Sequence, residues 1–370
     1  MEKDNKKFWV GFNQAKGIGP VRFRMLLDHF GNLEKAWNAS KGGLLQAGLP
    51  KKILENFIQF RDQFDFEKVE EQIHALDVQV LTWEDEGYPA RLLEIQNSPP
   101  VIFLRGNYLL EDRWAVAIVG TRRVSPYGRQ IASDLATYLA QNGVTVISGL
   151  ARGVDGIAQK AALKAGGRTI SVLGCGVDQI YPPENKAIFN EIIESGAIIS
   201  DYGLGTLPES HNFPPRNRII SGLSLASVII EAGRKSGALI TASYAAEQGR
   251  EVFSVPGNIY APMSKGTNHL IQQGARPLIE FDELLDLLDL RKSHQHQIAS
   301  KTIPSDKNEF IILKVISDES LHIDDILDKT NLTIEEVSAT LAILELKGLV
   351  RQAGGMNYTI CREVPLNYGE

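Results

Sequence analysis

Between residues 114 and 290 the chain alternates short apolar runs with longer segments whose apolar residues recur at helical spacing. The runs are rich in Val and Ile and mostly uninterrupted, as in parallel strands buried on both faces of a sheet. Six strands are predicted, at 114–119, 144–148, 169–173, 197–200, 226–230 and 251–255. Helices are predicted between them, at 128–141, 156–165, 184–194 and 238–248. This alternation predicts an α/β fold with a mostly parallel sheet core.

The pattern changes on either side of this region and predicts four parts. Residues 1–113 carry apolar residues at helical spacing, for example from Val21 to Phe30, and are predicted to form a helical domain with its connector. Residues 291–305 are polar without a sustained period, which predicts a linker. Residues 306–370 show three short helical patterns, at 310–316, 323–329 and 334–347, before a Gly-turned hairpin segment. Three helices and a hairpin are the outline of a winged helix.

Composition and charge refine this picture. The 370 residues include 39 Lys plus Arg and 45 Asp plus Glu, for a net charge of −6 and a globular composition. Taken whole, this charge argues against a nucleic-acid binder, which usually has a basic footprint. The charge is uneven, however: residues 114–280 carry 15 basic against 12 acidic residues, and residues 303–370 carry 6 against 12. The central region is therefore mildly basic, and the acidic C-terminal region is either a separate partner module or a competitor for the central region's ligand.

Several protein classes are disfavoured. Cys175 and Cys361 match no zinc or redox spacing, and a reducing cytoplasm is the predicted setting. The first residues are too short and interrupted for a secretory signal, and no run reaches the roughly 18 apolar residues of a membrane helix. A cytoplasmic protein with no membrane segment is predicted.

Small residues and cations gather where the predicted strands end. Four segments follow strands and begin at Gly120, Gly149, Gly174 and Glu231; a fifth, 212–218, lies between the fourth and fifth strands. Ligands of open parallel sheets bind beyond the carboxyl ends of the strands, where glycines admit close backbone approach and Arg or Lys bind phosphate oxygens. One such loop is more often only turn geometry. Five at one edge predict a phosphate-binding surface broader than a single nucleotide needs.

Known cofactor and catalytic motifs are missing. Gly120-Thr121-Arg122-Arg123 replaces the dinucleotide fingerprint, and there is no P-loop. His211 has no nucleophile paired with it in sequence, and His294 with His296 makes a poor zinc site. Four strand-end carboxylates are predicted to cap helices and orient arginines rather than to catalyse: Asp155, Asp178, Asp201 and Glu231. The prediction is a non-enzymatic protein without a cofactor or metal.

The same loops resemble the DNA-processing protein DprA (Smf) family over about residues 114–280. The matching motifs occur in family order: Ile118-Val-Gly-Thr-Arg-Arg, the segment 148–158, the segment 173–185, Phe213-Pro-Pro-Arg-Asn-Arg and its continuation to 224, Lys235-Ser-Gly-Ala-Leu-Ile-Thr-Ala, and Val255-Pro-Gly-Asn. One departure is Gln159, where relatives often have His. Together the motifs are highly specific.

The resemblance implies a Rossmann-like domain that binds single-stranded DNA, forms a homodimer and loads the RecA recombinase during natural transformation, with no cofactor. Matching motif positions imply DNA contacts, with Arg122 and Lys186 in a basic pocket and Phe213 as an apolar face for a base. The full predicted set is Gly120, Thr121, Arg122, Arg123, Arg152, Lys186, Phe213, Arg216, Asn217, Arg218, Lys235, Ser236 and Gly237.

The flanking regions resemble family modules too. Residues 1–113 resemble a sterile-alpha-motif-like or helix-hairpin-helix domain, in which Gly17-Ile18-Gly19-Pro20 either presents N–H groups to DNA or is only a tight turn between core helices. Residues 306–370 are similar to the family's winged-helix domain. Its expected recognition helix, 334–347, carries three Glu against one Lys and suits a protein partner better than DNA.

A second interpretation remains open: a nucleotide-binding sensor, or an enzyme similar to the phosphoribohydrolases that share this fold. Those enzymes carry a Pro-Gly-Gly-x-Gly-Thr-x-x-Glu loop. The equivalent stretch here, 231–240, lacks the Thr and the catalytic Glu at the expected positions. Release of base from nucleoside monophosphates would distinguish the two interpretations.

Overall fold

The computed structural model describes residues 5–287, 307–316, 321–330, 332–346, 349–352 and 356–360. It divides into two compact units, Met1–Leu284 and Leu285–Glu370. The predicted linker at 291–305, with His294 and His296, and also Cys361, lie outside the described residues. None of the helices among the described residues is both long enough and apolar enough to span a bilayer.

One sheet organises the first unit. Among the described residues nine strands form it, in the order β1-β2-β6-β5-β4-β3-β7-β8-β9. Neighbours from β6 to β9 are parallel, whereas β1 and β2 are antiparallel at one edge. The strands are β1 (Gln79–Thr82), β2 (Val101–Gly106), β3 (Ala115–Val119), β4 (Thr145–Ser148), β5 (Thr169–Val172), β6 (Ala197–Ser200), β7 (Ala226–Ile229), β8 (Glu251–Ser254) and β9 (Arg276–Pro277). The predicted α/β fold with a mostly parallel sheet is confirmed, and β3 to β8 are the six predicted strands.

The sheet also begins earlier than the sequence pattern predicts. β1 and β2 lie within residues 1–113, which were predicted to be helical, and β2 pairs with β6 over Phe103↔Ser200 to Gly106↔Ala197. The first four residues of β2 are apolar and buried, and they come directly after Pro99-Pro100. Those prolines end the preceding segment, but they do not separate it from the sheet. Residues 79–106 therefore belong to the same sheet as the central region.

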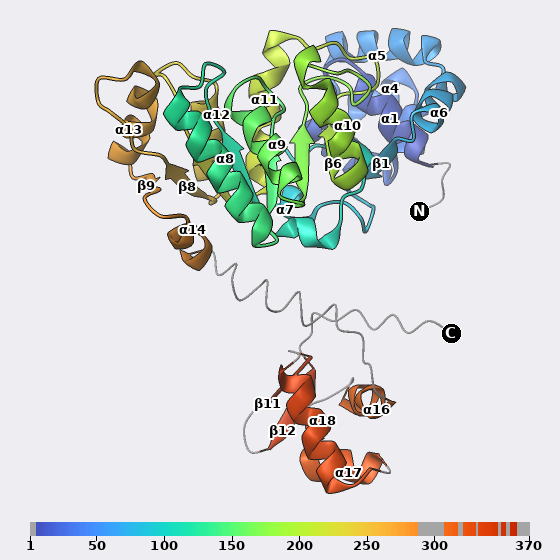
Figure 1. The fold of residues 1–370 in the computed structure, drawn as a ribbon. Helices are drawn as coiled ribbons and strands as arrows, with labels where there is room; N and C mark the ends of the chain where they lie inside the picture. The colour runs from blue at the N-terminus through green and yellow to red at the C-terminus, as the bar shows by residue number, and fades with distance from the viewer. Residues whose placement is uncertain are drawn as a thin grey trace. The chain divides into compact units, whose positions relative to one another are not determined.

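Helices cover both faces of the sheet (Figure 1). One layer contains α8 (Pro126–Gln141), α9 (Val154–Lys164) and α10 (Lys186–Ser195), with α9 packed against both neighbours. The other layer contains α7 (Ala90–Leu93), α11 (Phe213–Leu223) and α12 (Ala238–Glu247). Short connecting elements are η2 (Leu110–Arg113), η3 (Pro183–Asn185), η4 (Ser210–Asn212), η5 (Pro262–Ser264), α13 (Lys265–Gln272) and α14 (Phe281–Leu287). Apolar side chains of α7, α11 and α12 are buried together with those of the sheet, and apolar side chains of α8 and α9 are also buried.

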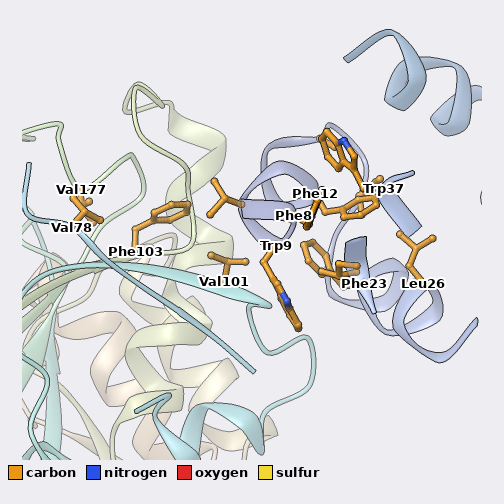
Figure 2. Packing of buried hydrophobic residues seen from close by; sticks show 14 of the residues in the cluster. Phe8, Trp9, Phe12, Phe23, Leu26, Trp37, Val78, Val101, Phe103 and Val177 are labelled. Atoms are coloured by element: carbon orange, nitrogen blue, oxygen red, sulfur yellow. The ribbon is translucent and has the colours of Figure 1, made fainter. Parts of the chain in front are cut away.

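A bundle of short helices precedes the sheet and shares a core with its β1–β2 edge. The helices are α1 (Lys6–Gln14), α2 (Pro20–Phe30), α3 (Leu33–Trp37), α4 (Lys41–Gln46), α5 (Lys51–Gln63) and α6 (Phe66–Ala75). Phe12 stacks on Phe57 with ring centroids 4.9 Å apart, and Trp37 meets Phe12 edge-on at 5.2 Å. Figure 2 shows Phe12 and Trp37 of this cluster together with Val101 and Phe103 of β2. The shared core fixes the bundle to the sheet.

Two similar turns connect helices of this bundle. Gly17 precedes α2 and Gly48 precedes α5, and both adopt a positive φ that favours glycine. Each is followed by a buried aliphatic residue, Ile18 or Leu49. Burial of these side chains shows that the turns serve the core; whether they also bind DNA stays a prediction.

The second unit confirms the predicted winged helix. It contains α16 (Lys307–Ile316), α17 (Ile323–Lys329) and α18 (Ile334–Leu346), and the strands β10 (Leu321–His322), β11 (Val350–Gln352) and β12 (Asn357–Ile360) in the order β10-β12-β11. Its own apolar core includes Ile312, Ile326 and Leu344. Thr333 and Glu336 form a capping box at the start of α18.

Candidate nucleic-acid interface

The candidate site lies where the strand order of the sheet reverses. β3 is flanked by β4 on one side and β7 on the other, so the loops that follow β3 and β7 diverge around a crevice. A groove of about 710 Å³ occupies this position. Predicted residues that line it are Gly120, Thr121, Arg122, Arg123, Phe213, Arg216, Asn217, Lys235, Ser236 and Gly237. The structure thus brings ten of the predicted residues to one groove.

Glu231 holds the loop after β3 in place. Its backbone oxygen accepts a hydrogen bond from the N–H of Thr121 at 2.7 Å, and its carboxylate accepts one from the N–H of Ser125 at 2.9 Å. Ser125 in turn caps α8 by accepting a bond from the N–H of Gly128. Since Glu231 is buried and these bonds fix the loop at both ends, the exposed side chains of Arg122 and Arg123 project from a rigid backbone.

An aromatic face lies beside these cations. Phe213 is the first residue of α11 and is half-buried. Its ring centroid is 5.5 Å from the guanidinium carbon of Arg122 and 5.8 Å from that of Arg216, and the ring of Tyr181 is 5.6 Å away. Cation–π and ring contacts of this kind hold the ring in position. The groove therefore places an apolar ring next to a group that binds phosphate.

Arg216 supports the site from beneath. It is 4% exposed, and its guanidinium donates to the backbone oxygens of Gly149 (3.0 Å) and Val172. A Cβ at Gly149 would overlap the guanidinium, so a larger residue here would force Arg216 to shift. Asp155 is also buried and accepts a hydrogen bond from the N–H of Gly149. Burial raises the pKa of Asp155 and lowers the pKa of Arg216, and each charge partly offsets that effect on the other.

The opposite wall is the start of α12. Lys235 and Gly237 are exposed, and Ser236 accepts a hydrogen bond from the N–H of Ala238 at the first position of the helix. Asn217 donates its side-chain amide to the backbone oxygen of Gly237 at 3.2 Å, which ties this loop to α11. Asn217 is itself buried, so its side chain orients the wall of the groove.

Three predicted contact residues lie outside this groove. Arg152 forms an exposed ion pair with Glu184 at 2.6 Å. Arg218 is paired with Asp201 at 2.9 Å and donates to the backbone oxygen of Asn97. Lys186 is the exposed first residue of α10. The segment 212–218, which was predicted to be a loop, is mostly the start of α11, and its helical geometry turns Arg216 inward and Arg218 toward Asp201.

Several residues that line the groove were not predicted from the sequence. Tyr181 stands seven residues beyond the start of its loop, and nothing in the pattern marks it as close to Phe213. Met263 lies in η5, and its backbone oxygen accepts a hydrogen bond from the N–H of Ala232. Its sulfur accepts one from the hydroxyl of Thr121 at 3.4 Å. The sequence pattern does not predict that the segment after β8, which contains Met263, returns to the groove.

The side chains considered as acid–base groups either hold structural partners in place or are exposed to solvent. Asp201 orients Arg218 and Glu231 holds the capping residue Ser125, which are the predicted roles of these carboxylates. His211 is 73% exposed at its side chain and lies 3.3 Å from Glu209. Burial raises the pKa of the Cys175 thiol to about 11, so this thiol stays protonated at neutral pH.

Gln159, the departure from the family pattern, is fully buried. Its amide nitrogen donates to the hydroxyl of Ser171 at 2.7 Å and to the backbone oxygen of Ile170 at 3.2 Å. It therefore joins α9 to β5 inside the layer. The departure affects a local contact and no wall of the groove.

Comparison with known proteins gives a consistent family match. The family model described as DNA recombination-mediator protein A matches residues 79–289, and the DprA winged helix domain matches residues 298–356. Protein Smf of Synechocystis is 36% identical over 97% of this chain and 99% of its own length. The DNA processing protein DprA of Bacillus subtilis is 40% identical over 55% of this chain and 69% of its own length.

Solved structures agree. The chain is similar to the X-ray structure of DNA processing protein A from Streptococcus pneumoniae, with a TM-score of 0.68 and 32% identity over 76% of this chain and 97% of that one. It is also similar to DNA processing protein A from Helicobacter pylori, whose structure is described in terms of a single-stranded DNA binding mode. That match has a TM-score of 0.52 and 34% identity over 57% of this chain and 95% of that one.

Proposed function

The chain belongs to the DprA (Smf) family, and from this premise we propose that it binds single-stranded DNA in the groove between β3 and β7. In this role it processes incoming DNA during natural transformation, protects it and delivers it to the RecA recombinase, without catalysing a reaction of its own. The Helicobacter pylori relative, whose structure is described as binding single-stranded DNA, supports the choice of ligand.

One observation carries the proposal: the ring of Phe213 lies against Arg122 in a groove whose exposed cations also include Arg123 and Lys235. Proteins that bind single strands without sequence preference combine a positive groove with aromatic rings on which bases stack. A paired duplex would offer its phosphates but not the faces of its bases. The arrangement therefore favours unpaired DNA.

A titration with labelled oligothymidylate and with a duplex of equal length tests this function. We expect tighter binding of the single strand, with a logarithmic salt dependence of about −0.7 for each phosphate neutralised. Equal affinity for the duplex, or affinity that does not change with salt, would contradict the proposal. Incubation with nucleoside monophosphates is the matched test of the enzymatic alternative, and steady release of free base would favour that alternative.

We further propose that the bound strand is handed to RecA in the cytoplasm. Support comes from the family description, which is that of a recombination mediator. If so, RecA should begin to hydrolyse ATP without a lag on DNA already coated by single-strand-binding protein once this protein is added. An unchanged lag at saturating protein would refute the loading step while leaving the DNA site intact.

A homodimer through the Rossmann-like domain is part of the same proposal. Three large apolar side chains near the β8–β9 end of the sheet are mostly exposed, at 70% for Ile259, 84% for Tyr260 and 64% for Ile279. Exposed apolar side chains gathered on one part of a domain are typical of an interaction surface. Light scattering of the free protein should then give twice the mass of one chain.

The winged helix suits a protein partner better than DNA. The described exposed positions of α18 include Ile334, Glu335, Glu336, Ile343 and Glu345, with no cation among them. An acidic and apolar helix surface would repel a phosphate backbone. We propose that this unit binds protein, and the alternative that it competes for the basic groove would appear as tighter DNA binding after deletion of residues 303–370.

A further inference from the structure

A second groove lies on the other side of the loop that follows β3. Its volume is about 430 Å³, and it is bordered by α8, α9 and the segment that leads into α10. The cations along it are Arg122, Arg123, Arg129 and Lys160, and its one acid is Glu184. Neither Arg129 nor Lys160 lies in one of the Gly- and cation-rich strand-end loops.

The charge of this groove is not neutralised. Arg123, Arg129 and Lys160 are exposed and form no ion pair within the described part of the chain. Glu184 is already paired with Arg152, whose side chain approaches to 2.6 Å. Four cations thus line the groove, and its one acidic residue, Glu184, is already paired with a fifth cation, Arg152. Such a surface attracts a polyanion.

The two grooves share a border. Arg122 and Arg123 border both of them, so these residues form a ridge that any ligand passing from one groove to the other must cross. The backbone of the ridge rests on Gly153, which has a φ of +81° and where a Cβ would clash with the backbone oxygen of Thr121. A side chain at position 153 would therefore displace the backbone that carries Arg122 and Arg123.

We propose that a single strand bound in the first groove continues over the Arg122–Arg123 ridge into the second, where Arg129 and Lys160 bind its phosphates. The inference rests on the proposed function and adds to it a second segment of the binding site. No aromatic residue borders the second groove, so its contacts are with the backbone and not with bases. Binding there is insensitive to sequence.

The test is the affinity of the full-length Arg129→Ala/Lys160→Ala variant for oligothymidylates that range from about 4 to about 16 nucleotides, the usual range of single-strand site sizes. Wild-type protein should gain affinity with length as the strand reaches the second groove. The variant should bind the shortest oligomers as wild type does, lose about tenfold or more on the longest, and show a salt slope there that is smaller by about 1.4.

The charge-retaining variant Arg129→Lys/Lys160→Arg is the matched control and should keep the affinity for long oligomers. Wild-type affinity of the alanine variant at all lengths would overturn the proposal. An equal loss at all lengths would also overturn it, because the second groove would then not be an extension of the first. Failure of wild-type protein to bind any oligomer would instead refute the proposed function.

Discussion

Replacement of Arg122 and Lys235 together by alanine is expected to lower the affinity for oligothymidylate by about 100-fold at low salt. The two cations line opposite walls of the groove, and both are exposed. A hydrogen bond to a charged group contributes about 1.5–3 kcal/mol, so the loss of two phosphate contacts corresponds to about 100-fold at the lower end of this range. The salt slope should become smaller by about 1.4.

Stability should change little in this variant, since both side chains are exposed and Arg122 loses a cation–π contact with Phe213 that contributes about 0.5–1 kcal/mol at an exposed site. A charge-matched control is Lys68→Ala/Lys164→Ala, which removes two exposed cations from α6 and from the far end of α9. It should keep nearly full affinity. If both double variants bind alike, net charge and not the groove governs binding, and the site is assigned wrongly.

Variants of Phe213 distinguish the contribution of base stacking to DNA affinity from the contribution of charge. Phe213→Ala should weaken binding about tenfold, since stacking of a base on an aromatic ring contributes about 1–3 kcal/mol. The salt slope should stay as in wild type because no phosphate contact is lost. Phe213→Tyr keeps a ring at this position and should bind nearly as well as wild type.

Arg216→Ala is expected to lower the free energy of unfolding by about 3–5 kcal/mol, the order of the cost when one of two interacting buried charges is removed. The guanidinium is 4% exposed and donates to the strand-end carbonyls of Gly149 and Val172. Its removal leaves these oxygens without their donor and leaves Asp155 buried without the nearby positive charge. Urea denaturation measures the effect directly.

Arg216 is therefore a positioning residue in this account, although its sequence motif predicts a DNA contact. Arg216→Lys should also be less stable than wild type, because an ammonium group does not reproduce the planar guanidinium that donates to the backbone oxygens of both Gly149 and Val172. If Arg216→Ala is as stable as wild type but loses much of its DNA affinity, Arg216 contacts DNA directly and is not a positioning residue.

The sequence alone predicts the sheet and the edge that carries the site. Six strands are predictable because parallel strands buried on both faces are mostly continuous apolar runs, and the loops at their carboxyl ends are rich in glycines and cations. Ten of the thirteen predicted residues line one groove for this reason. β1 and β2 are less visible: β1 has four residues with mixed exposure, and β2 follows two prolines.

Sequence does not show which cations face the ligand. Arg216 and Arg218 stand two positions apart in a segment rich in proline and asparagine, where a loop and a helix start look alike. Only the helical rise of α11 places Arg216 under the groove and Arg218 against Asp201. The contributions of Met263 and Lys160 depend on how distant segments fold back, and no local pattern encodes this.

The most direct measurement is a structure of the full-length protein with a bound oligothymidylate. We predict phosphates beside Arg122 and Lys235, and a base on the ring of Phe213. A strand bound elsewhere, for example at the Gly17 turn of the helical bundle or on the winged helix, with the groove between β3 and β7 empty, would contradict this prediction.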